Sequence, residues 1–265
     1  MNSLLTNLKV QHHLLFQLWA RDYAARYRGG LLGIGWSILN PLMTLAMYSF
    51  VFVVVFRMRW PSGPDIQGSF VILLFTGLIV HALFAEMVTR APLLIASNGA
   101  YVKKVVFPLE FLPLMPLYGA LVNFTVGLGL VLLLVFSLQG FIPLTVLYLP
   151  LVILPFVVAI VGITYFFAAS GVYVRDLAQL VSFIASISLF ASPVLYPLDS
   201  VPQPFRKILY INPITFAVEE LRHLSILGRP PDLIGLLYYS AFAAAIFFIG
   251  LSWFQNTKKG FADVL

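Results

Sequence analysis

The chain has 265 residues, of which 61% are hydrophobic and only 10% are charged, whereas soluble domains carry about 25% charged residues. Together with a mean hydropathy of +0.97, this composition excludes a soluble globular protein and indicates a chain whose solvent is a lipid bilayer. The net charge is +6 and the chain contains no cysteine, which excludes disulfides, thiolate catalysis and most zinc or iron–sulfur sites.

The sixteen basic residues lie in short clusters between apolar runs. A nucleic-acid-binding surface requires one contiguous basic face, whereas short basic clusters beside membrane spans are typical of cytoplasmic loops. We therefore expect membrane lipids, and no nucleic acid, among the partners. The first thirty residues lack the compact apolar core and the small-residue cleavage site of a signal peptide, so we expect the N-terminus to remain in the mature protein.

Uncharged intervals predict the membrane crossings, because a helix needs about 20 apolar residues to cross the hydrocarbon layer. The uncharged interval 111–174 is too long for one crossing and divides at the turn sequence SLQGFIP. We therefore expect an all-α integral membrane protein with a single transmembrane domain over residues 1–265 and six transmembrane helices. The predicted spans are residues 29–56, 66–88, 111–137, 144–174, 177–197 and 233–257.

The distribution of Lys and Arg favours both termini on the cytoplasmic side. With six spans and the N-terminus inside, ten of these residues fall on the cytoplasmic side and six outside. The stretch RDYAARYRGGLLGIGWSILNP, residues 21–41, contains the boundary between the cytoplasmic segment and the first span. Its charges end at Arg28, and the span begins at Gly29.

The N-terminal segment, residues 1–28, is expected to hold an amphipathic helix in the cytoplasmic interface. Leu4, Leu8, Leu15 and Trp19 lie along one side of such a helix, and polar residues lie elsewhere. A loosely ordered tail is the alternative.

The loop over residues 91–108 carries apolar residues together with Lys103 and Lys104. We interpret it as a short helix on the cytoplasmic face that is available to another protein. A plain basic anchor is the alternative.

Residues 198–230 lie in a proline-rich region that forbids a single straight helix. Within PITFAVEELRHLSIL, residues 213–227, an apolar set follows helical spacing, and Glu219, Glu220, Arg222 and His223 take the other side. A pair of short helices dipping back from the outer face and a folded external cap both remain open. The apolar set is Ile214, Ala217, Val218, Leu221 and Leu224.

The sequence lacks common nucleotide-binding and catalytic motifs. It contains no GxxxxGK[ST] phosphate loop, no GxSxG and no HExxH, so we expect no catalytic or metal site and no nucleotide-driven energy from this chain alone. His81 lies in the second predicted span, where an ionisable group is a functional candidate by default. A neutral histidine hydrogen-bonded between helices is the other interpretation.

The first and fifth predicted spans are rich in aromatic residues. Aromatic rings stack on the apolar faces of sugars without fixing a register, which would let a polymer slide. Other rings in these spans are expected to face lipid or to pack between helices. The candidate channel-lining residues are Trp36, Tyr48, Phe52, Phe56, Phe190 and Tyr196.

Four stretches carry a family resemblance: RDYAARYRGGLLGIGWSILNP, NGAYVKKVVFPLE, YVRDL and SPVLYPLDSVPQPFRKILYINPITFAVEELR. They resemble the integral-membrane permeases of ABC exporters that move polysaccharides, particularly the O-antigen and teichoic-acid type. The resemblance covers essentially the whole chain.

The resemblance implies a homodimer of permeases in the bacterial inner membrane, bound to two copies of a separately encoded ATPase. ATP and Mg²⁺ would bind in that partner, and the substrate would be a lipid-linked polysaccharide. The first cytoplasmic loop would carry the coupling helix that seats in the ATPase, with Ser97, Asn98, Tyr101, Lys103 and Lys104 as contacts.

The same family carries short re-entrant gate helices between its last two spans, which favours that interpretation of residues 198–230. The implied outer-gate residues are Pro213, Phe216, Glu219, Glu220 and Arg222.

By the same analogy, the pyrophosphate of the substrate would bind Arg26 and Arg28 at the cytoplasmic end of the first span. A planar guanidinium suits this role, because it donates two hydrogen bonds to phosphate oxygens. Simple anchoring of both arginines to anionic lipid headgroups is the alternative.

We expect two copies to face each other so that their first and fifth spans line the path. Competing functions are export of teichoic acid, capsule, a drug or a small lipid, and a membrane-embedded glycolipid transferase. A transferase should bring acidic or histidine residues together at one membrane face, and the sequence offers Glu86, Glu110, Asp176 and His81 for that purpose.

Overall fold

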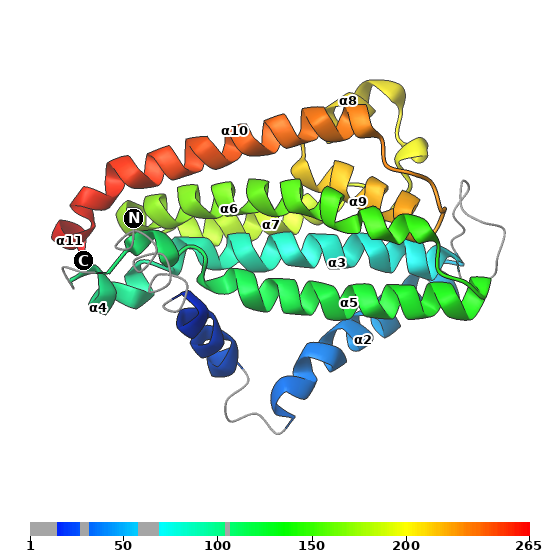
Figure 1. Ribbon diagram of the computed structural model, residues 1–265, viewed down its shortest axis with the longest axis horizontal. Coiled ribbons are helices and arrows are strands. Elements are labelled where there is room, and N and C mark those ends of the chain that lie inside the picture. The colour runs from blue at the N-terminus through cyan, green and yellow to red at the C-terminus, as the bar shows by residue number, and fades with distance from the viewer. Residues whose placement is uncertain (1–14, 27–31, 58–68, 104–106) are drawn as a thin grey trace, which may run out of the picture.

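The computed structural model describes residues 15–26, 32–57, 69–103 and 107–265. These residues are largely helical and contain no β-strand (Figure 1). The all-α prediction is therefore confirmed for the part of the chain that the structure describes.

Five helical stretches are long and apolar enough to cross a membrane. A helix of 25 residues rises about 37 Å, which exceeds the roughly 30 Å of a hydrocarbon core. The long helices are α2 (Trp36–Ser49, continued by a π-helical segment, Phe50–Val55), α3 (Ser69–Arg90), α5 (Met115–Gln139), α6 (Leu149–Tyr173) and α10 (Leu233–Thr257).

The predicted fifth span, residues 177–197, is wrong in length. Helix α7 covers Leu177–Phe190 and has 14 residues, which gives a rise of about 21 Å. The chain turns after Phe190, and Pro193 has no N–H group with which to continue a helical hydrogen-bond ladder. The described residues thus contain five helices of spanning length and a shorter apolar sixth.

Shorter elements connect the long helices. The short α-helices are α4 (Gly99–Val102), α8 (Gln203–Leu209), α9 (Pro213–Ser225) and α11 (Phe261–Val264). The 3-10 turns are η1 (Gly33–Gly35), η3 (Ala91–Leu93), η4 (Ala96–Asn98), η5 (Leu109–Phe111), η6 (Leu144–Tyr148), η7 (Leu198–Ser200) and η8 (Lys258–Gly260).

Helix α3 is the most buried of the five long helices, and it contacts α5, α7 and α9. Helix α10 lies along α6, whereas α2 diverges from the bundle beside α5 (Figure 1). The apolar surface of α2 is therefore left largely uncovered within one chain, and Met43, Met47 and Phe50 are exposed.

Two glycines allow α6 and α10 to approach closely. A Cβ atom added to Gly250 would lie 1.9 Å from the carbonyl oxygen of Gly162, and one added to Gly162 would lie 2.5 Å from the Cα atom of Phe247. Small residues permit such backbone contact between membrane helices, where van der Waals packing drives association.

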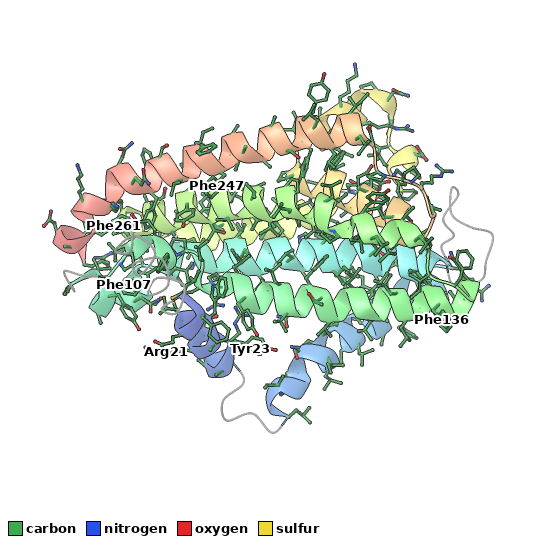
Figure 2. The ribbon with its side chains drawn as sticks, in the orientation of Figure 1. Arg21, Tyr23, Phe107, Phe136, Phe247 and Phe261 are labelled. Atoms are coloured by element: carbon green, nitrogen blue, oxygen red, sulfur yellow. The ribbon has the colours of Figure 1, made fainter. Side chains whose placement is uncertain are left out.

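The connecting segments gather at two opposite ends of the bundle. The helix over residues 15–26, the short helix α4 and the C-terminal α11 share one end, which we call the α4 end (Figure 1). Helices α8 and α9 lie toward the other end, the α9 end. Figure 2 shows Arg21, Phe107 and Phe261 at the α4 end and Phe136 at the α9 end. Segments predicted to lie on one side of the membrane thus share one end of the bundle.

Candidate functional site at the two ends of the bundle

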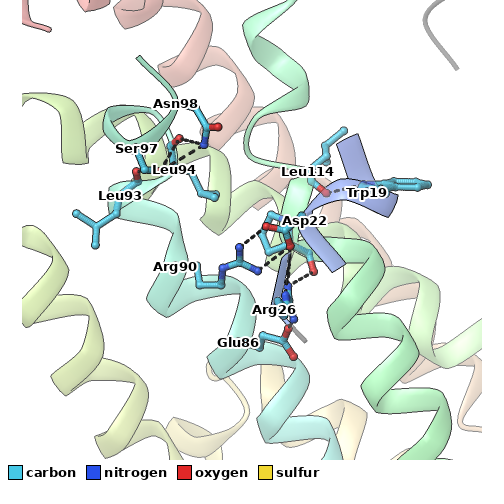
Figure 3. A network of polar contacts seen from close by, with 11 residues as sticks. Trp19, Asp22, Arg26, Glu86, Arg90, Leu93, Leu94, Ser97, Asn98 and Leu114 are labelled. Carbon is cyan, nitrogen blue, oxygen red and sulfur yellow. Dashed lines mark hydrogen bonds and ion pairs between the residues drawn. The ribbon is translucent and has the colours of Figure 1, made fainter. Parts of the chain in front are cut away.

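At the α4 end, Asp22 binds arginines from two different helices (Figure 3). Its Oδ1 lies 2.5 Å from Nη2 of Arg90, and its Oδ2 lies 3.0 Å from Nη1 of Arg90 and 3.1 Å from Nη2 of Arg26. The Asp22 side chain is 11% exposed. Because Arg90 is the last residue of α3, this carboxylate joins the helix over residues 15–26 to the point where the 91–108 loop begins.

Arg26 extends the same network toward α5. Its Nη1 forms an ion pair with Glu86, and Oε2 of Glu86 accepts a hydrogen bond of 3.0 Å from Asn123. The guanidinium lies against Gly119, where an added Cβ would be 2.7 Å from Cζ. Two carboxylates therefore engage the arginine that the sequence predicts as a phosphate ligand. Arg28, its predicted companion, lies outside the described residues.

The predicted coupling loop forms the three short turns η3, η4 and α4 rather than one continuous helix. Ser97 Oγ donates to the carbonyl oxygen of Leu93 at 2.7 Å, and Asn98 Nδ2 donates to that of Leu94 at 2.9 Å. These side chains satisfy backbone groups at the ends of the turns. Lys103 is exposed, and Lys104 lies outside the described residues.

Tyr101 connects this loop to the helix over residues 15–26. Its hydroxyl accepts a hydrogen bond of 2.8 Å from Nη1 of Arg21. Its ring centroid lies 4.5 Å from that of Phe107. The Tyr101 side chain is thus held by Arg21 at its hydroxyl and by Phe107 at its ring.

The base of the loop is clamped against α6. A Cβ atom on Gly171 would lie 2.1 Å from the carbonyl oxygen of Pro92, so the two backbones touch. Ile95 is fully buried, whereas Leu93 is 56% exposed. The loop therefore has one side rooted in the bundle and another that is open to contact.

The C-terminal segment is joined to the same end. Lys258 forms an ion pair with Glu110, and the hydroxyl of Tyr165 donates to the Glu110 carbonyl oxygen at 2.8 Å. Phe261 is fully buried.

A cleft of about 170 Å³ separates α2 from α3 and α5. Trp36, Asn40 and Thr44 line it from α2, and Glu86 and Asn123 line it from the other two helices. Trp36, one of the predicted channel-lining residues, thus borders a cleft that Glu86 of the ion-pair network also lines.

The other predicted channel aromatics fall into two groups. Along α2 and its continuation, the ring centroids of Tyr48 and Phe52 lie 6.1 Å apart and those of Phe52 and Phe56 5.9 Å apart. At the end of α7, Tyr196 donates a hydrogen bond of 2.9 Å to the carbonyl oxygen of Phe190. The outermost rings, Phe56 and Phe190, are 63% and 67% exposed.

Arg222 organises the α9 end, and it is buried although the helical pattern places it opposite the apolar side of α9. Its side chain is 2% exposed. It donates to the carbonyl oxygens of Leu73 at 2.9 Å, Pro193 at 2.6 Å and Val194 at 3.0 Å, and to Glu219 Oε1 at 2.8 Å. Burial lowers the pKa of Arg222, and the neighbouring Glu219 opposes this change. A buried charge is tolerated when it is paired and fully hydrogen-bonded.

Glu220 is also buried, at 4% exposure, although the sequence pattern places it on the polar side. Its Oε2 accepts a hydrogen bond of 3.3 Å from the backbone N–H of Asp232, just before α10. The predicted apolar side of α9 is confirmed, because all five of its residues are fully buried. These residues are Ile214, Ala217, Val218, Leu221 and Leu224.

Pro213 and Phe216 hold the beginning of α9 against α10. The carbonyl oxygen of Pro213 accepts a hydrogen bond of 2.7 Å from the hydroxyl of Tyr239. The Phe216 ring stacks on that of Tyr239 with centroids 4.6 Å apart. The five predicted outer-gate residues thus share one helix that is anchored on both α3 and α10.

The acidic and histidine residues that a transferase would need do not converge. Glu86 pairs with Arg26, and Glu110 pairs with Lys258. His81 Nε2 lies 3.0 Å from the carbonyl oxygen of Ala185 and 3.1 Å from Ser188 Oγ, so this histidine is hydrogen-bonded between α3 and α7. Asp176 is exposed at the junction of α6 and α7.

Several residues of these networks were missed by sequence reasoning, namely Asp22, Arg90 and Asn123. The spacing of Asp22 and Arg26, four residues apart, signals a helical ion pair. Contacts over 68 residues, as between Asp22 and Arg90, leave no such local signal.

Five helices of spanning length among the described residues define a multi-pass membrane protein. Residues 13–225 match the ABC-2 type transporter membrane family, and the chain belongs to this family.

Relatives with assigned names match over nearly the full length. The chain is 29% identical over 265 residues to the O-antigen export system permease protein RfbA of Myxococcus xanthus, covering 99% of both chains. It is 28% identical over 262 residues to RfbA of Klebsiella pneumoniae, covering 98% of this chain and 97% of the relative. It is 25% identical over 260 residues to the polysialic acid transport protein KpsM of Escherichia coli, covering 96% and 97%.

Proposed function

We propose that this chain is the permease of an ATP-driven exporter that moves a lipid-linked, O-antigen-like polysaccharide across the bacterial inner membrane. The observation that carries this proposal is the full-length similarity to permeases named for O-antigen export and polysialic acid transport. The lack of convergence among Glu86, Glu110, Asp176 and His81 disfavours the glycolipid transferase.

The working unit in this proposal is a homodimer bound to two ATPase subunits. The sequence has no phosphate loop, so ATP and Mg²⁺ bind in the partner. Ser97, Asn98, Tyr101, Lys103 and Lys104 form the contact with the ATPase. Exposed Leu93 adds an apolar contact at the same place.

The contacts at the α4 end support a path for the mechanical signal. Force applied to the 91–108 loop reaches α6 through the Pro92–Gly171 backbone contact. It reaches the interface helix through two side-chain links, Arg90 with Asp22 and Tyr101 with Arg21. The loop therefore acts on α3, α6 and the interface helix at once, because it contacts all three of them.

A sixth crossing is part of the proposal even though α7 is short. Irregular backbone at membrane depth is tolerated where it is buried in protein and its polar groups are satisfied. Arg222 donates to the carbonyl oxygens of Pro193 and Val194, and Asn212 Nδ2 donates to that of Ala191 at 3.0 Å. We therefore assign the turn after α7, with α8 and α9, to a re-entrant outer gate that completes the crossing.

The transport path in this proposal lies between two copies that face each other through α2 and α7. Exposed apolar side chains on both helices support this arrangement, including Met43 and Met47 on α2 and Phe183 and Ile187 on α7. The candidate aromatics of both helices then line the path. The charge distribution supports a cytoplasmic location of the α4 end and both termini in this proposal.

Arg28 is the better candidate for the substrate pyrophosphate, because Arg26 already pairs with two carboxylates. We expect Arg28→Ala to reduce export at equal expression, and Arg175→Ala, an exposed arginine after α6, to leave it unchanged. Unchanged export by Arg28→Ala would contradict the substrate role and favour anchoring to lipid headgroups.

Co-purification with a partner ATPase tests the proposed function. The reconstituted pair should hydrolyse ATP faster when lipid-linked polysaccharide is present in the membrane. Equal hydrolysis with and without the polysaccharide, in a pair that stays assembled, would contradict it.

A further inference from the structure

A second cavity, of about 590 Å³, lies at the α9 end between α9 and the beginning of α10. Five ionisable side chains line it: Glu219, Glu220, His223, Arg229 and Asp232. Their positions are fixed by the fold. Asp232 Oδ1 caps α10 by accepting hydrogen bonds of 3.1 Å from the N–H groups of Ile234 and Gly235.

The charges around this cavity do not cancel. Glu219 is neutralised by the buried Arg222. Glu220 Oε1 lies 3.6 Å from Nδ1 of His223. The remaining carboxylates, Glu220 and Asp232, stand against the lining cation Arg229, which leaves one negative charge when His223 is neutral. Because Glu220 is 4% exposed, its charge acts through a medium of low dielectric constant and attracts a cation strongly.

Aromatic rings form the rest of the wall. Phe216 and Tyr239 stack on each other, and Tyr238 is 73% exposed on the same first turns of α10. Ring faces attract ammonium groups, more strongly when water is excluded. Carboxylates beside ring faces are therefore complementary to an organic cation.

The cavity lies beside the beginning of the α10 span, where hydrocarbon is expected to give way to headgroups. The spanning stretch of α10 begins at Leu233, and Tyr residues are enriched at this boundary. Phe242, one turn beyond Tyr238, also lines the cavity and is exposed. A ligand in this cavity would contact charged side chains before α10, such as Asp232, and the apolar surface of Phe242 along α10.

We propose that this cavity binds the headgroup of a zwitterionic phospholipid with a primary ammonium, of the ethanolamine type. The ammonium lies among Glu220, Asp232 and the tyrosine rings, and the phosphate pairs with Arg229. The acyl chains follow Tyr238 and Phe242 along α10. The site is distinct from the α2–α3–α5 cleft, and it does not depend on which polysaccharide is exported.

Two other occupants fit the cavity less well. The described part of the chain contains no group of three His, Cys, Asp or Glu side chains suited to holding a metal ion. A neutral saccharide would stack on the rings but would leave the excess negative charge unbalanced.

Native mass spectrometry of the full-length protein tests the proposal. The protein is exchanged into nanodiscs that contain equal amounts of phosphatidylethanolamine and phosphatidylglycerol with identical acyl chains. We expect each chain to retain one phosphatidylethanolamine, with at least about tenfold preference over phosphatidylglycerol.

Tyr238→Ala and Arg229→Gln should each weaken retention about three- to tenfold, since both side chains are exposed and their loss leaves the fold intact. Phe248→Ala is the matched control, because Phe248 is an exposed ring on the same helix outside this cavity. Its retention should equal that of the natural protein.

Equal retention of both lipids would overturn the proposal, as would undiminished retention by Tyr238→Ala and Arg229→Gln. Displacement of phosphatidylethanolamine by a neutral trisaccharide would also overturn it and would assign the cavity to sugar.

Discussion

Asp22 and Arg90, 68 residues apart in the chain, form a two-point ion pair with distances of 2.5 and 3.0 Å. Asp22 belongs to the helix over residues 15–26, proposed as the interface helix, and Arg90 is the last residue of α3, directly before the loop proposed to meet the ATPase. Any movement of that loop that shifts the end of α3 must therefore move the interface helix or break this pair.

The first prediction concerns Asp22→Asn. This change removes the anion that holds Arg26 and Arg90 together, so the helix over residues 15–26 should lose its link to the end of α3 at Arg90 and keep only the Arg26–Glu86 pair. We expect export to fall at least about tenfold while the ATPase still binds and hydrolyses ATP. The measurement is the ratio of polysaccharide export to ATP hydrolysis in the same reconstituted complex.

Asp176→Asn is the control for this change, because Asp176 is an exposed acid at the same end of the bundle. It should leave the ratio of export to hydrolysis unchanged. If Asp22→Asn also leaves that ratio unchanged, the interface helix does not transmit the signal.

The second prediction tests the contact between α6 and α10. Gly250→Ala places a Cβ atom where the carbonyl oxygen of Gly162 lies, which forces the helices apart and should cost about 1–3 kcal/mol. Gly129→Ala on α5 is the matched control, since nothing lies within 4 Å of its added Cβ atom. Thermal unfolding in detergent should show a lower midpoint for Gly250→Ala alone, and equal midpoints would exclude the close approach.

The third prediction concerns Arg222 as the anchor of the outer gate. Arg222→Met leaves the carbonyl oxygens of Leu73, Pro193 and Val194 without this donor, so the turn after α7 should open. The natural chain has no cysteine, so Ser192→Cys, at a fully buried position in that turn, reports the opening without background.

We expect a thiol reagent to label this cysteine at least about tenfold faster when Arg222→Met is present. Arg175→Met, which removes an exposed arginine at the opposite end, serves as the control. Equal labelling rates in both backgrounds would show that Arg222 does not hold the turn.

The fourth prediction uses the ion pair between Glu110 and Lys258. Glu110→Lys and Lys258→Glu should each lower thermal stability by up to about 1 kcal/mol, since both side chains are about one-third exposed. The double swap should restore most of the loss, because the pair is reformed with opposite polarity. Losses that simply add would mean that the two side chains do not interact.

Long apolar runs made the spans predictable from the sequence. Helix α10 covers Leu233–Thr257, the same residues as the last predicted span, because Asp232 caps its beginning and the run has no internal break. The apolar side of α9 was predictable for a similar reason, since its 3.6-residue period is strong.

The polar interior was not predictable by the same means. Arg222 reads as a surface residue in a helical pattern, and its burial depends on carbonyl groups from α3 and from the turn after α7. The predicted fifth span, residues 177–197, extends beyond the end of α7 at Phe190. A count of uncharged residues does not detect the turn that follows α7. The pairing of Arg26 with Glu86 was not predictable either, because Glu86 lies on α3, 60 residues away in the chain.

Transport into sealed proteoliposomes tests the central claim most directly. Vesicles that contain this protein, its co-purified ATPase and lipid-linked polysaccharide on the ATPase side should move the glycan to the opposite face when ATP is added. The account predicts no movement without ATP or with this protein alone. Movement by this protein alone, with no nucleotide hydrolase attached, would contradict it.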